Sequence, residues 1–171
     1  VITMAVNKQK KGEILKDLKE LFGRIKTATF VNFHGLSVKD TSALRRGLRE
    51  DNVRLFVAKK TLIKKALGEA AIPGDIPMLD GEIAIAYPHT EDADITASAR
   101  GVYAFQKKFD GRLSIVGGIF ERMFRGKEGM LEIATIPSMK TLRGMFVNVI
   151  NSPIQGLVVA LSAIAEAKES K

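Results

Sequence analysis

Lysines gathered around a short helix give the sequence its clearest chemical signal. The stretch Arg54–Leu67, RLFVAKKTLIKKAL, predicts a strand that passes through lysines into a helix. Lys60 and Lys64 are four residues apart and therefore share one helical face, with further lysines beside them. Thr61 is predicted to cap the helix, whose start presents free N–H groups and a partial positive charge. This pattern predicts a phosphate-binding site, and a solvated lysine face is the equally weighted alternative.

The distribution of charge favours the phosphate site. The 171-residue chain has a net charge of +8. Residues 1–67 contain 16 Lys and Arg against 6 Asp and Glu, residues 68–137 contain 7 against 11, and residues 138–171 contain 4 against 2. A positive field concentrated at one end of a chain is typical of a polyanion binder. An anionic membrane surface is the competing explanation.

Two other helices of the first part add to this positive charge. Arg45 and Arg49 share one face of a predicted helix, with Arg46 beside them. Lys10 and Lys11 stand near the start of the first predicted helix, where the helix dipole disfavours cations, which suggests that an external anion offsets the cost.

Composition limits the class of protein. Apolar residues make up 46% of the chain and charged residues 27%, as in soluble globular proteins. There is no cysteine, which excludes disulfides and thiolate metal sites and favours a reducing compartment. The first residues, VITMAVNKQKK, lack the apolar segment of a secretory signal, and Met4 is an alternative start to Val1.

The first 136 residues predict an α+β domain. Period and turn residues place helices at 8–26, 37–51, 62–67 and 92–109, strands at 28–33, 53–58, 82–87 and 113–120, and a loop with a short helix at 121–136. This order predicts a two-layer ferredoxin-like (βαββαβ) sandwich with an added N-terminal helix. Ser37 and Asp40 form a capping box, and Gly117-Gly118 suggest a bulge. The strands lack the aromatic signature of an RNA-recognition motif, so Phe30, Phe33 and Phe56 are assigned to the core.

The chain after Pro137 predicts a helical tail. One amphipathic helix is expected to end at Asn151, and Ser152 to cap a second one with Pro153 in its first turn. At about 1.5 Å per residue the second helix, to Lys168, is about 24 Å long, which is too short to span a membrane. Its apolar stripe must be covered, either by the domain itself or by a partner's groove, and periodicity does not decide between them.

Two segments of the chain resemble the bacterial large-subunit ribosomal protein ten family, the stalk-base proteins of the ribosome. The stretch HGLSVKDTSALRRGLREDNVRLFVAKKTLIKKAL contains the family's glycine after the first strand, its Leu-Arg pair and its later arginine. The family's Val-(Lys/Arg)-Asn-Thr-Leu motif is matched at Val57–Leu62, where Lys60 replaces the asparagine and adds a charge. The paired tail helices, with the Gly-Leu-Val-x-x-Leu segment Gly156–Leu161, are also similar.

This resemblance implies a structural role in the large ribosomal subunit. Proteins of the family anchor on large-subunit ribosomal RNA beside ribosomal protein eleven. Their C-terminal helix carries dimers of the acidic stalk protein, ribosomal protein seven/twelve, which recruit translational GTPases. In some bacteria the complex also represses its own operon by binding messenger RNA. The tail here is short for the family, so two dimers are expected, on a cytoplasmic ribosome and without a cofactor.

We therefore predict an RNA-binding domain at 1–136 and a helical tail at 137–171, with the partner-binding helix at 152–171. The predicted RNA-binding residues are Lys8, Lys10, Lys11, His34, Gly35, Arg45, Arg46, Arg49, Lys59, Lys60, Thr61, Lys64 and Lys65. The predicted partner-binding residues are Ile154, Leu157, Val158, Leu161, Ile164 and Ala165.

Three alternatives compete with this interpretation. The acidic residues Asp75, Asp80, Glu82, Glu91, Asp92 and Asp94 and the nearby His89 could form an enzyme or metal site. They lack any ligand spacing, so neither catalysis nor metal binding is expected. A peripheral membrane protein would carry Lys or Arg along the polar face of its last helix, where this chain has Gln155, Ser162, Glu166 and Lys168. A ribosome-assembly factor of the same family would dock on the same RNA without carrying stalk protein.

Overall fold

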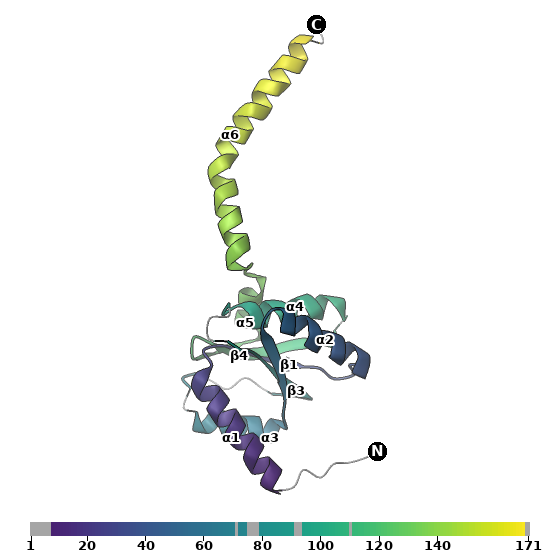
Figure 1. Cartoon of the computed structure of the whole chain (residues 1–171), viewed down its shortest axis with the longest axis vertical. Coiled ribbons are helices and arrows are strands. Elements are labelled where there is room, and N and C mark those ends of the chain that lie inside the picture. The colour runs from purple at the N-terminus through teal and green to yellow at the C-terminus, as the bar shows by residue number, and fades with distance from the viewer. Residues whose placement is uncertain (1–7, 71, 75–78, 91–93, 110, 170–171) are drawn as a thin grey trace. The chain divides into compact units, whose positions relative to one another are not determined.

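The chain divides into two compact units, Val1–Ile136 and Pro137–Lys171. The structure is a computed structural model, and it describes residues 8–70, 72–74, 79–90, 94–109 and 111–169 (Figure 1). Parts of the predicted loop at 68–81, and Glu91 and Asp92 of the acidic group, lie outside the described residues.

The first unit is built on an antiparallel sheet with the strand order β2-β3-β1-β4-β5. Its strands are β1 (Ala28–Asn32), β2 (Val53–Val57), β3 (Ile83–Pro88), β4 (Ser114–Phe120) and β5 (Met123–Gly126). The first four strands have the order of a βαββαβ fold, so the predicted fold class is confirmed. The sequence analysis missed β5, because the turn before it uses Glu121 and Arg122 at φ of 50° and 61° instead of the usual glycine or asparagine.

Helices cover both faces of this sheet. They are α1 (Lys8–Arg24), α2 (Val38–Glu50), α3 (Lys60–Glu69), α4 (Ala97–Lys108) and α5 (Lys127–Thr135). Helices α2, α4 and α5 lie on one face, and α1 and α3 lie together on the other (Figure 1). The predicted two-layer sandwich therefore carries a second helix layer, which explains why Ile83–Ala86 are buried without alternation.

Each face of the sheet has its own apolar core. Leu48 of α2, Val102 of α4 and Ile115 of β4 are buried in the first core. Leu18 of α1 and Phe30 of β1 are buried in the second. Burying one such side chain stabilises the fold by about 1.5–3 kcal/mol. Of the three phenylalanines assigned to the core, Phe30 is fully buried. Phe33 is half-buried against the first core, and Phe56 is half-buried against the second.

The Gly117-Gly118 pair lies at an irregularity in the sheet. The pairing of β1 with β4 shifts between Phe30 and Val31, which confirms the bulge inferred from the two glycines. A Cβ atom at Gly118 would lie 2.4 Å from the Ala28 carbonyl oxygen and 2.7 Å from Cε of Met130. A side chain at this position would therefore clash with the backbone of β1, which glycine avoids.

One predicted helix cap is confirmed, and the predicted starts of two other helices are wrong. The Ser37 hydroxyl accepts a hydrogen bond from the Asp40 N–H at 3.1 Å, so the predicted cap of α2 is confirmed. The Thr61 cap is wrong, because α3 begins at Lys60 and Lys59 occupies the cap position without a side-chain hydrogen bond. Helix α4 begins at Ala97 instead of 92, which leaves Ile95 outside the helix and exposed instead of on its apolar face.

Asp94 fixes the turn that precedes α4. Its carboxylate accepts hydrogen bonds from the Thr96 N–H at 3.1 Å, the Thr96 hydroxyl at 2.9 Å and the Arg100 guanidinium at 2.9 Å. Partial burial acts to raise the pKa of Asp94, but the hydrogen bonds from Arg100 and Thr96 outweigh it and lower the pKa below its ordinary value of 3.8. Asp94 is therefore a structural residue rather than an acid of a catalytic site.

Asp94→Asn should destabilise the first unit by about 1–2 kcal/mol at pH 7. A carboxylate whose pKa is lowered by folding stabilises the fold at pH values above its pKa in the unfolded chain. This stabilisation is lost as the pH falls through the pKa of the carboxylate in the folded chain. The difference between variant and parent should therefore shrink towards pH 3. Urea unfolding followed by tyrosine fluorescence measures it, and an equal difference at both pH values would contradict this role.

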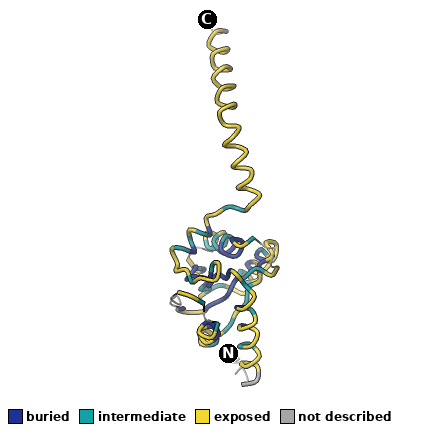
Figure 2. The backbone as a smooth tube through the Cα atoms, turned by 90° about the vertical axis from the view of Figure 1, so that its left-hand side faces the viewer, coloured by how far each residue is buried: buried dark blue, intermediate teal, exposed yellow. Residues whose placement is uncertain are grey.

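The second unit is the helix α6 (Met139–Glu169). The predicted break at Asn151 is wrong: the helix continues through, with Pro153 inside it. A proline removes one backbone hydrogen bond from a helix, and the hydrogen bonds of the turns before and after it hold the helix together. The described residues 139–168 are exposed throughout (Figure 2).

The continuity of α6 also changes its length. At about 1.5 Å per residue its 31 residues extend about 46 Å. By length and composition alone, Met139–Lys168 could cross a membrane, with a mean hydropathy of 1.5 in its apolar window. The estimate of a helix too short to span a membrane is therefore corrected.

Candidate nucleic-acid interface

Positive side chains from both helix layers converge on the edge strand β2. This strand pairs only with β3, so its other edge is free of strand partners within the described sheet. Helix α2 lies on one side of this edge, and α1 and α3 lie on the other. Two depressions border the strand, and each contains residues that the sequence predicted to bind RNA.

The lysine depression, of about 750 Å³, lies where β2 leads into α3. Lys11 of α1 lines it together with Lys59 and Lys60 at the start of α3. An ion pair between Lys19 and Glu69 joins later turns of the same two helices, so α1 and α3 begin at the same end. The remaining lining residues are Ile14, Phe33, Val57, Ala58, Leu62, Gly81, Glu82 and Ile83.

Electrostatics make the lysine depression a site for anions. Neither α1 nor α3 has an acidic residue in its first turn, and no side chain caps the start of α3. The start of α3 and three lysines therefore bring positive charge to one concave surface, and Glu82 is the one acidic residue among those that line it. A phosphate group fits this arrangement.

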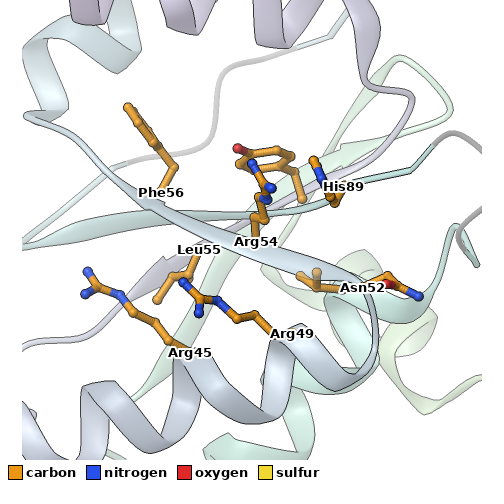
Figure 3. Close-up of a pocket in the computed structure, with 9 residues that line it drawn as sticks. Arg45, Arg49, Asn52, Arg54, Leu55, Phe56 and His89 are labelled. Atoms are coloured by element: carbon orange, nitrogen blue, oxygen red, sulfur yellow. The ribbon is translucent and has the colours of Figure 1, made fainter.

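The arginine depression, of about 770 Å³, lies on the β2 edge beside α2 (Figure 3). Arg45 and Arg49 extend from α2 towards the strand, and Arg54 projects from the strand itself (Figure 3). The other lining residues are Asn52, Val53, Leu55, Phe56, Tyr87 and His89, none of them acidic. Within the described part of the chain, none of the three arginines forms an ion pair. Arg46 and Glu50 lie in a shallower depression with Arg45 and Arg49.

The remaining predicted RNA-binding residues lie outside these depressions. Lys10 is exposed in the first turn of α1; Lys8 begins that helix, but its side chain is not among those described. His34 and Gly35 form the turn after β1, where Gly35 adopts a φ of +78°. Exposed positions on α3 are occupied by Thr61, Lys64 and Lys65.

Arg54, Tyr87 and His89 did not figure among the predicted RNA-binding residues. Arg54 is the first residue of the lysine-rich stretch 54–67, and a charged residue inside a predicted strand could have indicated its role. His89 is close to the acidic residues in the sequence, but it lines the arginine depression, and its backbone N–H donates a hydrogen bond to the Asn52 carbonyl oxygen at 2.8 Å. No group of potential metal ligands exists among the described residues, and Asp75, Glu91 and Asp92 lie outside them.

Helix α6 exposes many of its own apolar side chains. The predicted partner-binding residues Ile154, Leu157, Val158, Leu161, Ile164 and Ala165 are all exposed. Phe146, Val147 and Val159 are exposed as well, so the apolar surface includes the first half of the helix and is wider than one stripe. A helix with an exposed apolar surface this wide requires a cover.

The fold and its positive edge are typical of a structural protein that binds a polyanion. Comparison with known proteins agrees: the sequence profile of Ribosomal protein L10 matches residues 6–107, more than half of the chain. The large ribosomal subunit protein uL10 of Bacillus licheniformis is 35% identical over 159 residues, 93% of this chain and 91% of that protein. The protein of the same name from Lactobacillus acidophilus is 33% identical over 144 residues, 84% of each chain.

The chain therefore belongs to the ribosomal protein L10 family. As a member, it is a structural protein of the large ribosomal subunit, located on the ribosome in the cytoplasm, and not an enzyme.

Proposed function

We propose that the first unit anchors the stalk base on large-subunit ribosomal RNA, next to ribosomal protein eleven. The observation that carries this proposal is the convergence of Lys11, Lys59, Lys60 and three arginines on one strand edge. Such a surface neutralises the phosphates of a folded RNA and recognises its shape. The same surface would bind messenger RNA where the complex represses its own operon.

Salt dependence of binding tests the RNA surface. Mobility-shift titrations of the full chain with large-subunit ribosomal RNA should show an affinity that falls steeply between about 50 and 200 mM salt. An affinity that does not change over this range would contradict the proposal.

We further propose that α6 carries dimers of the acidic stalk protein, ribosomal protein seven/twelve, which then recruit translational GTPases. Its exposed apolar side chains would pack in the grooves of partner helices. Asn151, Ser152 and Pro153 interrupt the apolar sequence near the middle of α6. The exposed apolar side chains of the helix therefore form two groups, in the segments 139–150 and 154–164.

Two segments predict two stalk-protein dimers per chain. Native mass spectrometry of the reconstituted complex should accordingly show four copies of the stalk protein on one copy of this chain. Six copies would contradict the division of α6 into two segments.

A membrane is the second candidate for the cover of α6, because its length and hydropathy suffice. The polar residues around Pro153 argue against it, because they would lie at the centre of the span, where polar groups are most costly. Flotation with anionic vesicles separates the two partners: we expect the full chain to remain at the bottom of the gradient. Chain floating with the vesicles would favour the membrane. A ribosome-assembly factor of the same family would bind ribosomal RNA but leave added stalk protein unbound.

A further inference from the structure

The arginine depression crosses the free edge of β2, with Arg45 and Arg49 on the side of α2 and Arg54 and Tyr87 on the side of α1 and α3 (Figure 3). We propose that it takes a single nucleotide extruded from the bound RNA. The phosphates of that nucleotide lie on Arg45 and Arg49, and its base lies on Tyr87 beside Arg54. This inference rests on the proposed RNA-binding function and assigns a part of the RNA to a defined place on the protein.

Arg45 and Arg49 form the phosphate side of the depression. They are one helical turn apart on α2, exposed, and directed towards the β2 edge (Figure 3). No carboxylate lines this depression, and neither guanidinium group forms an ion pair among the described residues, although Glu50 lies in the neighbouring depression with both arginines. Guanidinium groups bind phosphate oxygens in pairs of parallel hydrogen bonds, and two successive arginines therefore suit an RNA backbone.

Arg54 and Tyr87 form the base side. They stand directly opposite each other on β2 and β3, so their side chains emerge next to each other on the same side of the sheet. Tyr87 is half-buried and packs against the core beneath α1 and α3, which holds the ring in place. Tyrosine rings and arginine planes are the usual supports for an unstacked RNA base.

The size and position of the depression favour an unpaired nucleotide over a paired one. The depression of about 770 Å³ lies within the range of about 300–1,000 Å³ that is usual for ligand pockets. A paired base would have to give up its pairing and stacking to enter such a space, at a free-energy cost that an unpaired base largely avoids. The free edge of β2 also offers backbone N–H and C=O groups that could bind the edge of an entering base. The lysine depression has Phe33 as its one aromatic lining residue and lacks the paired arginines of α2.

Two RNA hairpins that differ only in whether a complementary nucleotide faces one 2-aminopurine test this inference with the full chain. In one, a single 2-aminopurine nucleotide is unpaired; in the other, it is paired. We expect the unpaired probe to bind about ten-fold more tightly, with a change in 2-aminopurine fluorescence as the base stacks. Tyr87→Leu should remove this ten-fold preference, whereas Tyr87→Phe, which keeps the ring, should retain it. The double variant Arg45→Gln with Arg49→Gln should lower the affinity for both hairpins.

The outcomes separate this inference from the proposed function. Equal affinity for the two hairpins, or an unpaired preference that survives Tyr87→Leu, overturns the nucleotide pocket and leaves RNA binding intact. Absence of binding to both hairpins and to ribosomal RNA overturns the proposed function itself. An unchanged affinity of Tyr87→Leu for the paired probe shows that the variant is folded. Displacement of the unpaired probe by micromolar AMP would assign the pocket to a free nucleotide and overturn the RNA assignment.

Discussion

A chain carrying both Phe146→Asp and Leu161→Asp should lose at least about 100-fold of its affinity for the acidic stalk protein. Phe146 is 67% exposed and Leu161 57% exposed, one on each side of Pro153. A carboxylate at either position would have to be buried without a partner when an apolar groove closes on α6, and such a burial is costly. Native mass spectrometry should show two copies of the stalk protein on each single variant and none on the double variant.

Ser162→Asp is the matched control, because it places the same charge one residue from Leu161 at a position that is already polar. We expect it to keep four copies of the stalk protein. The double variant should also keep its affinity for RNA, because the lysine and arginine depressions are in the first unit. Four copies on the double variant would place the partner interface elsewhere.

The second large effect concerns RNA. Lys11→Ala with Lys60→Ala removes two cations that α1 and α3 contribute to the lysine depression. Each phosphate contact adds about one unit to the slope of log affinity against log salt concentration, so the double variant should lose about two units. Mobility-shift titrations at several salt concentrations measure the slope.

Lys127→Ala is the control for this pair. It removes an exposed lysine at the start of α5, which follows β5 at the opposite edge of the sheet. We expect its slope to match that of the parent chain. A double variant with an unchanged slope would show that the lysine depression does not bind phosphate.

The sequence predicted the elements whose signals are local. Apolar period located the first four strands and their helices, and the Ser37 side chain caps α2 as its spacing with Asp40 indicated. The bulge near Gly117-Gly118 was also predictable, because two glycines inside a strand signal a disturbed ladder.

The remaining features depend on contacts between distant residues or on weak local signals. Strand β5 has four residues and an unusual turn, and its pairing with β4 gives it a place in the sheet. Ser152 and Pro153 are typical of a helix start, but the structure has one continuous helix, α6, through both residues. Arg54 and Tyr87 meet through the register of β2 with β3, which no sequence period reveals. The candidate site was therefore predictable as a set of cations but not as two separate depressions.

The central claim is that separate units of one chain bind RNA and stalk protein at the same time. Gel filtration with light scattering of the full chain, mixed with large-subunit ribosomal RNA and the acidic stalk protein, tests it most directly. We predict one peak that contains all three components, with four copies of the stalk protein. Separate peaks, in which stalk protein displaces the RNA or remains unbound, would contradict the account.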